Sequence, residues 1–238
     1  MTPIEHPSLL LLPGLLCDAR LWRDQVEGLA DLASVSIADL SGADSIPELA
    51  SSVLAQAPTG RFALAGLSMG GYVALEIMRQ APERILALAL LDTSARPDTP
   101  EATEGRLKLM QLAETNFPAV PHSLLPKLVH PAHQEDASIV GLIVSMANSL
   151  GKDAFLRQQR AMIGRVDSRG SLLLVQCPTL VLCGREDELT PVALHQELAA
   201  GIRGAKLVVV EACGHLSTLD QPPEVTAALR QWVSALES

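Results

Sequence analysis

The chain has 238 residues, 48% of them hydrophobic, and its 27 Asp and Glu residues outnumber its 18 Lys and Arg residues to give a net charge of −9. This composition indicates a globular protein and excludes a disordered one, and the length fits one large domain or a domain with an insertion. The acidic balance argues against general binding of nucleic acid, because a phosphate backbone is recognised by a basic face.

Two further features bear on location. No apolar run approaches the roughly 20 residues of a membrane span, and residues 1–7 lack the basic region that opens a signal peptide. The cysteines form no C-x-x-C pair and match neither a zinc site nor a small disulfide scaffold, so we expect reduced thiols. They are Cys17, Cys177, Cys183 and Cys213. These features predict a cytoplasmic protein, and they carry no signal for a particular oligomeric state.

Strand-like and helix-like segments alternate along most of the chain. Apolar runs predict strands at 8–14, 33–40, 62–67, 85–92, 179–184 and 206–212. Helical spacing predicts helices at 19–31, 45–57, 70–80, 190–202 and 223–236. Such alternation implies parallel crossovers, so we expect an α/β fold with a sheet of about six mostly parallel strands and helices on both of its faces.

The alternation stops between residues 95 and 169. Prolines punctuate this region, and its clearest helical patterns lie at 101–116, 136–150 and 153–164. A segment of this length is too long for an ordinary loop. We therefore expect an all-helical insertion at 95–169, with the α/β core formed by residues 1–94 and 170–238.

The junction of the third predicted strand with its helix reads Gly66-Leu67-Ser68-Met69-Gly70, a G-x-S-x-G sequence. A serine hydroxyl is a poor nucleophile unless it is presented at a fixed, exposed point beside a base. A sharp strand-to-helix turn presents it in that way and strains its backbone. Gly66 and Gly70 remove side chains that would collide where strand and helix close up. The alternative is a glycine-rich turn with an idle serine.

Candidate partners for the serine follow the last two strands. Because ligands bind at the carboxyl ends of parallel strands, residues that directly follow a strand are the first candidates. Asp187 follows the fifth strand and His215 follows the sixth. His215 would take the Ser68 proton and return it to the leaving group, and Asp187 would orient the imidazole. Ser, Asp and His in this order predict a catalytic triad.

Each of these residues also has an ordinary interpretation. Acidic side chains before a helix are often a solvated N-terminus, and a histidine after a strand is often a hydrogen-bonded loop residue. Glu186 and Glu188 are weaker candidates for the acid. Asp92, at the end of the fourth strand, is the serious rival to Asp187.

The loop after the first strand is where a second oxyanion donor is expected. The predicted donors are the backbone N–H groups of Leu15 and Met69. Cys17 is a conceivable nucleophile, but no histidine is placed beside it, so an inert thiol is the better interpretation. His130 and His133 lack a carboxylate motif that would complete a metal site, so we expect them on the surface of the insertion.

Four stretches together resemble the α/β-hydrolase superfamily: LLLPGLLCDARLW, GLSMGG, PTLVLCGREDELTP and CGHLSTLDQPPEV. Within it, the short chain and helical cap resemble small serine esterases and lactonases, including the enol-lactonase-like and menaquinone-pathway-like branches. The resemblance implies Ser68 as nucleophile, Asp187 as acid and His215 as base, with no cofactor and no metal. One departure is Pro13-Gly14 where many relatives have His-Gly, so the polar support of a histidine is missing from the oxyanion loop.

The nucleophile restricts the chemistry, because the dehalogenases and epoxide hydrolases of this superfamily use an aspartate at this position. We expect hydrolysis of a small carboxylic ester or lactone through an acyl-Ser68 intermediate. A C–C hydrolase or lyase, a thioesterase, or a small-molecule receptor with little turnover are the alternatives. Phe117 and Phe155 are the cap's only aromatic residues, which weakly favours an aliphatic pocket. Arg157 and Arg160 either meet a substrate carboxylate or are simply solvated.

Overall fold

The computed structural model of the protein describes residues 6–236, so part of the N-terminal segment considered above as a possible signal peptide, residues 1–5, lies outside it. All six predicted strands form, and they pair in parallel in the order β2-β1-β3-β4-β5-β6. They are β1 (Ser8–Leu12), β2 (Ser34–Ile37), β3 (Phe62–Leu67), β4 (Ile85–Leu91), β5 (Thr179–Gly184) and β6 (Lys206–Val210). The predicted α/β fold is therefore confirmed.

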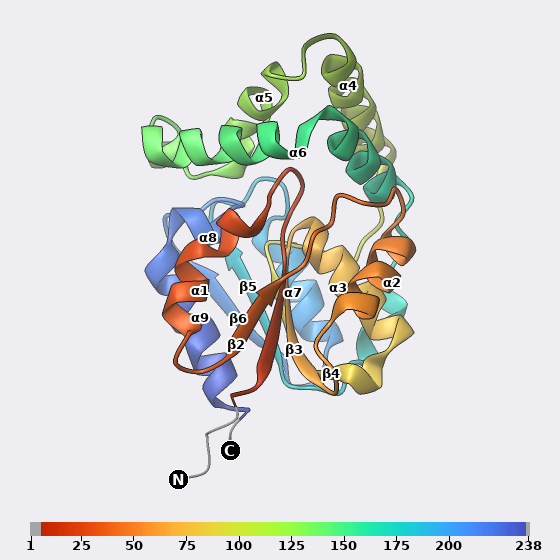
Figure 1. The fold of residues 1–238 in the computed structure, drawn as a ribbon, viewed down its shortest axis with the longest axis vertical. Helices are drawn as coiled ribbons and strands as arrows, with labels where there is room; N and C mark the ends of the chain where they lie inside the picture. Colours follow the sequence, from red (N-terminus) through yellow and green to blue (C-terminus); the bar gives the residue numbers. More distant parts are fainter. Residues whose placement is uncertain (1–5, 237–238) are drawn as a thin grey trace.

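Helices cover both faces of this sheet (Figure 1). One face carries α1 (Arg23–Leu29), α8 (Ser217–Asp220) and α9 (Pro222–Ser234), and the other carries α2 (Ile46–Gln56), α3 (Met69–Gln80) and α7 (Val192–Gly201). Strand β1 shows why its sequence is continuously apolar. Successive side chains point to opposite faces, so Leu9 and Leu11 join the core beneath α1 and α9, whereas Leu10 and Leu12 join the core beneath α2 and α3.

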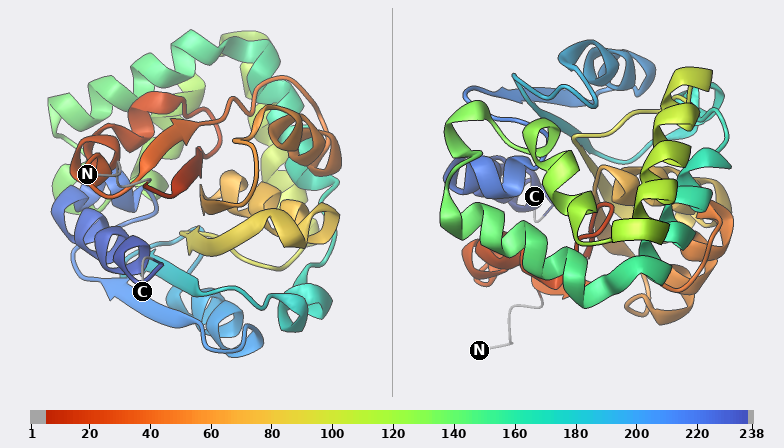
Figure 2. Two further views of the ribbon diagram at one scale, coloured as in Figure 1. Left: turned by 60° about the horizontal axis from the view of Figure 1, so that its bottom comes forward. Right: turned by 90° about the horizontal axis from the view of Figure 1, so that it is seen from above.

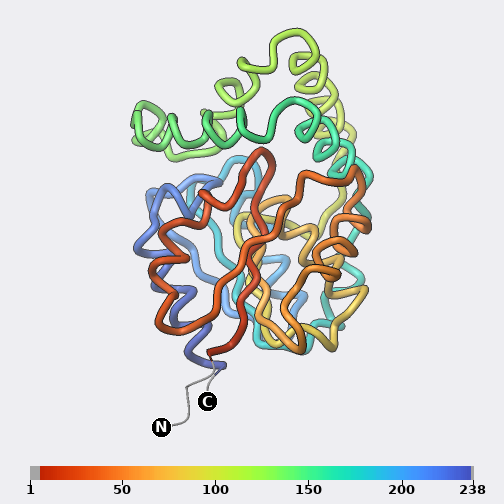
Figure 3. The backbone as a smooth tube through the Cα atoms, in the orientation of Figure 1, coloured from red at the N-terminus to blue at the C-terminus, as the bar shows by residue number. Residues whose placement is uncertain are grey.

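Three long helices lie between β4 and β5 and cover the carboxyl ends of the strands (Figures 1 and 2). They are α4 (Pro100–Asn116), α5 (Ala119–Leu128) and α6 (Ala137–Ile163). The chain leaves the core and returns to it on the same side of the molecule (Figure 3). The Ser168 N–H donates to the Ala95 carbonyl at 2.8 Å, which holds the outgoing and returning connections together.

The insertion differs from its sequence pattern in two places. Helix α5 was not predicted, because prolines at 121 and 126 are typical of a break in a helix. Pro121 lies in the first turn of the helix, where the missing N–H costs no hydrogen bond, and Pro126 lies inside the helix. The two predicted helices at 136–150 and 153–164 form one run, α6, with a break at Gly151, whose φ is 78°.

Helix α6 is also the one described helix that is long and apolar enough, by length and composition, to cross a membrane. The break at Gly151 interrupts it, and it packs against α4 and α5. Four 3-10 helices complete the described elements: η1 (Ala19–Trp22), η2 (Pro82–Arg84), η3 (Pro131–His133) and η4 (Arg169–Leu174).

Candidate active site

Ser68 lies at the sharp turn between β3 and α3. Its backbone has φ 55° and ψ −114°, a conformation that strains any residue with a side chain. The turn is very tight: a Cβ atom on Gly66 would overlap the Gly70 carbonyl, and one on Gly70 would overlap the Leu12 carbonyl. The two glycines of the G-x-S-x-G sequence thus let the strand, the helix and β1 approach closely enough to raise Ser68 from the sheet.

Ser68, His215 and Asp187 form a continuous chain of hydrogen bonds. The His215 Nε2 atom lies 2.8 Å from Ser68 Oγ, and His215 Nδ1 lies 2.8 Å from Asp187 Oδ2. Because a carboxylate only accepts, Nδ1 carries the proton and Nε2 faces the serine as an acceptor. The structure therefore brings together the three residues that the sequence singled out from the ends of three strands.

The loop after β5 fixes the Asp187 carboxylate. Its Oδ1 atom accepts from the N–H groups of Leu189 and Thr190, both at 2.8 Å, and Oδ2 accepts from the Thr190 hydroxyl at 2.6 Å. Burial by itself raises the pKa of the Asp187 carboxyl, but the charge of His215 and these hydrogen bonds outweigh it and hold the pKa below its usual range. Asp187 is thus an ionised partner for His215.

The side chain of His215 is 4% exposed. Burial by itself lowers the pKa of His215, whereas the Asp187 carboxylate beside it raises that pKa, and the result lies above the ordinary value of 6.5. Asp187 therefore stabilises the imidazolium that forms when His215 takes up a proton. This electrostatic arrangement suits a general base.

Asp92, the rival acid, makes no hydrogen bond to His215. Its buried carboxyl group accepts from the Gly184 N–H at 3.1 Å and lies 2.5 Å from the Ser217 hydroxyl. Burial and the neighbouring Asp187 charge raise the pKa of Asp92 to about 8. Asp92 thus connects Gly184, which precedes the loop that contains Asp187, with Ser217, which lies two residues after His215.

The weaker acid candidates have other positions. Glu186 accepts from the Cys213 N–H at 2.9 Å, and Glu188 lines the cavity described below.

The loop after β1 has a polar partner that sequence reasoning missed. The side chain of Gln158, in α6, accepts from the Leu16 N–H at 3.0 Å and donates to the Leu40 carbonyl at 3.2 Å. Gln158 is 1% exposed, so both contacts are shielded from water. This amide gives polar support to the loop after β1. Two glutamines on a helix face that is otherwise apolar were the signal that could have indicated it.

The predicted oxyanion donors lie on either side of this arrangement. Leu15 precedes the residue that Gln158 holds, and Met69 is the first residue of α3, directly after Ser68. Within residues 6–236, neither backbone N–H is engaged in a hydrogen bond. Both groups are therefore free to donate, and the Met69 group also lies at the positive end of the α3 dipole.

A cavity of about 780 Å³ separates the strand ends from the inserted helices. Ser68 and His215 line it together with the oxyanion loop and side chains from α4, α5 and α6. Its apolar wall includes Leu15, Leu109, Leu112, Leu124, Ile143 and Met162. The volume is that of a typical small-molecule site.

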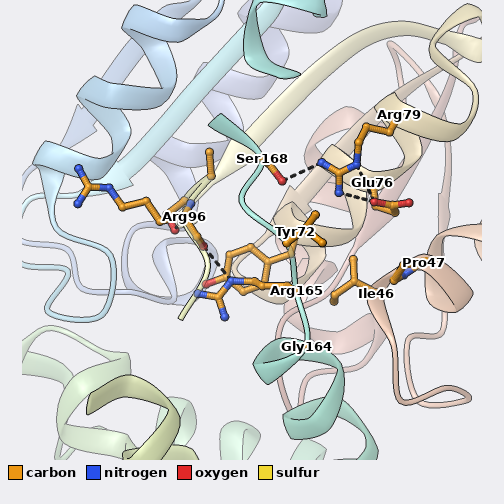
Figure 4. Close-up of a pocket in the computed structure, with 12 residues that line it drawn as sticks. Ile46, Pro47, Tyr72, Glu76, Arg79, Arg96, Gly164, Arg165 and Ser168 are labelled. Carbon is orange, nitrogen blue, oxygen red and sulfur yellow. Dashed lines mark hydrogen bonds and ion pairs between the residues drawn. The ribbon is translucent and has the colours of Figure 1, made fainter. Parts of the chain in front are cut away.

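The connections to the inserted helices are fixed where they cross α3, around a hollow of about 20 Å³ (Figure 4). The guanidinium of Arg165 lies over the ring of Tyr72, 4.3 Å from the ring centre, and its Nε donates to the Arg96 carbonyl at 3.0 Å. Arg79 pairs with Glu76 and donates to the Ser168 hydroxyl at 2.9 Å.

The remaining candidates take no part in the hydrogen-bond chain. Burial and the charge of Asp18 raise the pKa of the Cys17 thiol to about 12, which leaves it protonated and unreactive. His130 and His133 are partly exposed in the insertion, but both contact a buried carboxylate. The Asp220 carboxylate accepts from the His130 N–H at 2.8 Å and bonds the His133 ring at 2.7 Å.

Asp220 also accepts from the Gly214 N–H at 2.6 Å, so it ties the insertion to the residue before His215. Within the described residues, no group of three or more His, Cys, Asp or Glu side chains is arranged to hold a metal ion.

Comparisons with known proteins show which family has this sequence and fold. A model of the alpha/beta hydrolase family matches residues 9–229. A pimeloyl-[acyl-carrier protein] methyl ester esterase from Nitrosomonas europaea is 27% identical over 233 residues, which cover 92% of each chain. The biotin biosynthesis bifunctional protein BioHC of Cellvibrio japonicus is 24% identical, and the match covers 98% of this chain but only 49% of that protein. Among solved structures, a thermophilic esterase from Thermogutta terrifontis has a TM-score of 0.89 and 29% identity, covering 98% of this chain and 92% of that one.

Proposed function

The chain belongs to the alpha/beta hydrolase family, and we propose that it is a serine hydrolase that cleaves a small carboxylic ester or lactone through an acyl-Ser68 intermediate. The observation that carries this proposal is the chain of 2.8 Å contacts from Asp187 through His215 to Ser68. This series of hydrogen bonds ends at a cavity of about 780 Å³, which is large enough for a small ester and its leaving group. The esterases among the relatives support the same chemistry.

In the acylation half of the reaction, Ser68 Oγ attacks the carbonyl carbon while its proton moves to His215 Nε2. The carbonyl oxygen becomes an oxyanion, for which the Leu15 and Met69 N–H groups are the proposed donors. The tetrahedral intermediate then collapses, the bond to the alkoxide oxygen breaks, and the imidazolium gives its proton to that oxygen. With a lactone, the released hydroxyl stays attached to the acyl group.

Deacylation repeats these steps with water. His215 Nε2 takes a proton from the water as its oxygen attacks the acyl carbon, and the second tetrahedral intermediate expels Ser68 Oγ, which regains the proton from His215. Throughout both halves Asp187 stays ionised and stabilises the imidazolium, which agrees with the lowered pKa of its carboxyl.

The division into core and cap belongs to the same proposal. Residues 1–94 and 170–238 form the hydrolase core, and residues 95–169 form a cap that selects the substrate. The position of α4, α5 and α6 over the carboxyl ends of the strands supports it, because these helices provide much of the cavity wall. The aliphatic side chains in that wall favour an aliphatic acyl or alcohol group. A cytoplasmic location stays a prediction, in keeping with four cysteines that form no disulfide.

Covalent labelling tests the proposed nucleophile. A fluorophosphonate probe transfers its phosphonyl group to an activated serine with loss of fluoride. We expect one equivalent of label per chain, and peptide mass spectrometry should locate it on Ser68. Label on Cys17 or on another serine, with Ser68 unmodified, would contradict the proposal.

A further inference from the structure

We propose that the substrate carries an anionic group, such as a carboxylate, in addition to the bond that is cleaved, and that Arg106 and Gln159 bind this group in the cavity. The inference rests on the proposed function, whose substrate it narrows. Both residues line the cavity that contains Ser68 and His215.

The charge of the cavity wall is opposite to that of the protein. Five Lys or Arg side chains line the cavity against three Asp or Glu side chains. The whole chain carries a net charge of −9. A positive pocket in a negative protein concentrates the field on the ligand, because the walls around it have a low dielectric constant.

Two of the positive side chains in the cavity wall, Arg106 and Arg165, pair with the same carboxylate, that of Asp98. Arg106 Nε lies 2.6 Å from Asp98 Oδ2, and Arg165 lies 2.5 Å from Asp98 Oδ1. The Asp98 side chain is 3% exposed, the Arg165 side chain 8% and the Arg106 side chain 20%. In the part of the chain that the structure describes, the two guanidinium groups thus share one paired carboxylate. One positive charge is left without an ion-pair partner of its own in a largely buried place, which is costly unless an anion binds there.

The two arginines are not equivalent. Arg165 is occupied by the protein, because it also donates to the backbone carbonyls of Arg96 and Met162 and lies over the Tyr72 ring (Figure 4). Among residues 6–236, the Arg106 guanidinium bonds only to Asp98 and, at 3.1 Å, to the Gln159 Oε1 atom. Since a guanidinium has five N–H groups, Arg106 retains donors for a ligand.

Gln159 adds a second free donor beside this guanidinium. Its side chain is 0% exposed and its Oε1 atom is used by Arg106, but its Nε2 atom has no hydrogen-bond partner within the described residues. A buried amide donor without a partner costs free energy that a ligand oxygen would recover. Neighbouring guanidinium and amide N–H groups match the two oxygens of a carboxylate.

Two observations place this donor pair near the reacting atoms. The preceding residue, Gln158, bonds the oxyanion loop at Leu16, so this turn of α6 lies against the catalytic side of the cavity. Burial lowers the pKa of His215, and the Asp187 carboxylate raises it above its ordinary value. The positive charge of Arg106 also lowers this pKa. The Arg106 charge is therefore close enough to oppose protonation of the imidazole.

Three other cations of the cap are less suited to this role. Arg157, considered from the sequence, donates to the Ser41 carbonyl at 2.8 Å and does not line the cavity, and Arg160 is exposed outside it. Lys108 lines the cavity but is 70% exposed and pairs with Glu104.

Two matched substrates test the inference: mono-p-nitrophenyl glutarate and p-nitrophenyl pentanoate, which differ in a terminal carboxylate against a methyl group. We expect the kcat/KM of the wild type to be at least about tenfold higher for the anionic ester, as for a charge-assisted contact. Added salt should raise the KM for the glutarate ester and leave the KM for the pentanoate ester unchanged. O-acetyl-γ-hydroxybutyrate against butyl acetate makes the same comparison on the alcohol side.

Variants of the chain assign the preference to residues. Arg106→Gln and Gln159→Leu should each lower the anionic-to-neutral ratio, and Gln159→Leu leaves the Arg106–Asp98 pair in place if the arginine variant fails to fold. Arg160→Gln removes the same charge outside the cavity and should leave the ratio unchanged. Equal kcat/KM for anionic and neutral esters on both sides, or an equal effect of Arg160→Gln and Arg106→Gln, would overturn the inference.

Calorimetry of glutarate binding to the Ser68→Ala variant separates this inference from the proposed function, because it requires no turnover. Binding that is lost in the Arg106→Gln, Ser68→Ala double variant supports the anion site even if no ester is cleaved. Absence of binding to Ser68→Ala, with ester hydrolysis intact in the wild type, rejects the anion site alone.

Discussion

The Gln158 side chain and the Leu16 N–H form a 3.0 Å hydrogen bond between residues 142 positions apart. This bond joins helix α6, above the cavity, to the loop that provides one of the proposed oxyanion donors. The inserted helices therefore do more than cover the site, because one of them holds the loop in the conformation in which the Leu15 N–H is left free.

Replacing Gln158 tests that role. Gln158→Leu leaves the Leu16 N–H and the Leu40 carbonyl buried without partners, at a cost of about 1–3 kcal/mol each. We expect the oxyanion loop to shift and kcat to fall by about 10- to 100-fold, with a smaller change in KM. Steady-state kinetics measures this split. Gln111→Leu, at an exposed position of α4, is the control, and an unchanged kcat in Gln158→Leu would rule out the positioning role.

The pH profile of kcat/KM reports the base. Only neutral His215 accepts the Ser68 proton, so activity is present above the pKa of His215 and is lost as the pH falls through it. Because the Asp187 carboxylate raises that pKa above 6.5 against the effect of burial, the acid limb should lie above pH 6.5. A profile that stays flat down to about pH 5 would indicate a different base.

The two buried aspartates should differ sharply in their effect on turnover. Asp187→Asn removes the negative charge beside His215 and disturbs its tautomer, so we expect kcat to fall by about 10⁴-fold. Asp92 accepts hydrogen bonds from Gly184 and Ser217, and burial together with the Asp187 charge raises its pKa to about 8, so an amide is a close substitute at neutral pH. We expect Asp92→Asn to lose less than about tenfold in kcat. A larger loss in Asp92→Asn than in Asp187→Asn would reverse the assignment.

Asp220 should matter for stability. Its buried carboxylate serves the N–H groups of His130 and Gly214 and the ring of His133. Asp220→Ala leaves these partners unsatisfied, and we expect the free energy of unfolding to drop by about 3 kcal/mol in urea denaturation. The control is Asp167→Ala, which breaks an exposed pair with Arg169 and should leave stability nearly unchanged. Equal stabilities of the two variants would contradict the proposed connection.

The core of the fold was predictable because its signals are local. Every residue of β3 and β5 is buried, so each strand reads as an uninterrupted apolar run, and both observed ranges match the predicted ones. The order of Ser68, Asp187 and His215 was readable for a related reason. A parallel sheet brings the ends of its strands together, so residues far apart in sequence are placed side by side by topology alone.

The contacts within the cap were not predictable in this way. Gln158 and Gln159 have the same side chain in adjacent positions, yet one bonds the oxyanion loop and the other bonds Arg106. Which face each one meets depends on how α6 packs over the sheet, and the sequence pattern does not specify that packing. For the same reason, Arg157 and Arg160 were considered as substrate ligands from their spacing, whereas Arg106, from a different helix, lines the cavity.

The central claim is that Ser68 is the nucleophile of a hydrolase with multiple turnovers. Steady-state hydrolysis of p-nitrophenyl esters of increasing acyl length tests it directly, with the wild type and Ser68→Ala measured side by side. We expect many turnovers from the wild type and a loss of at least about 10³-fold in kcat in Ser68→Ala, with an unchanged circular dichroism spectrum and melting temperature. A folded Ser68→Ala variant with wild-type activity, or a wild type that releases one equivalent of product and stops, would contradict the claim.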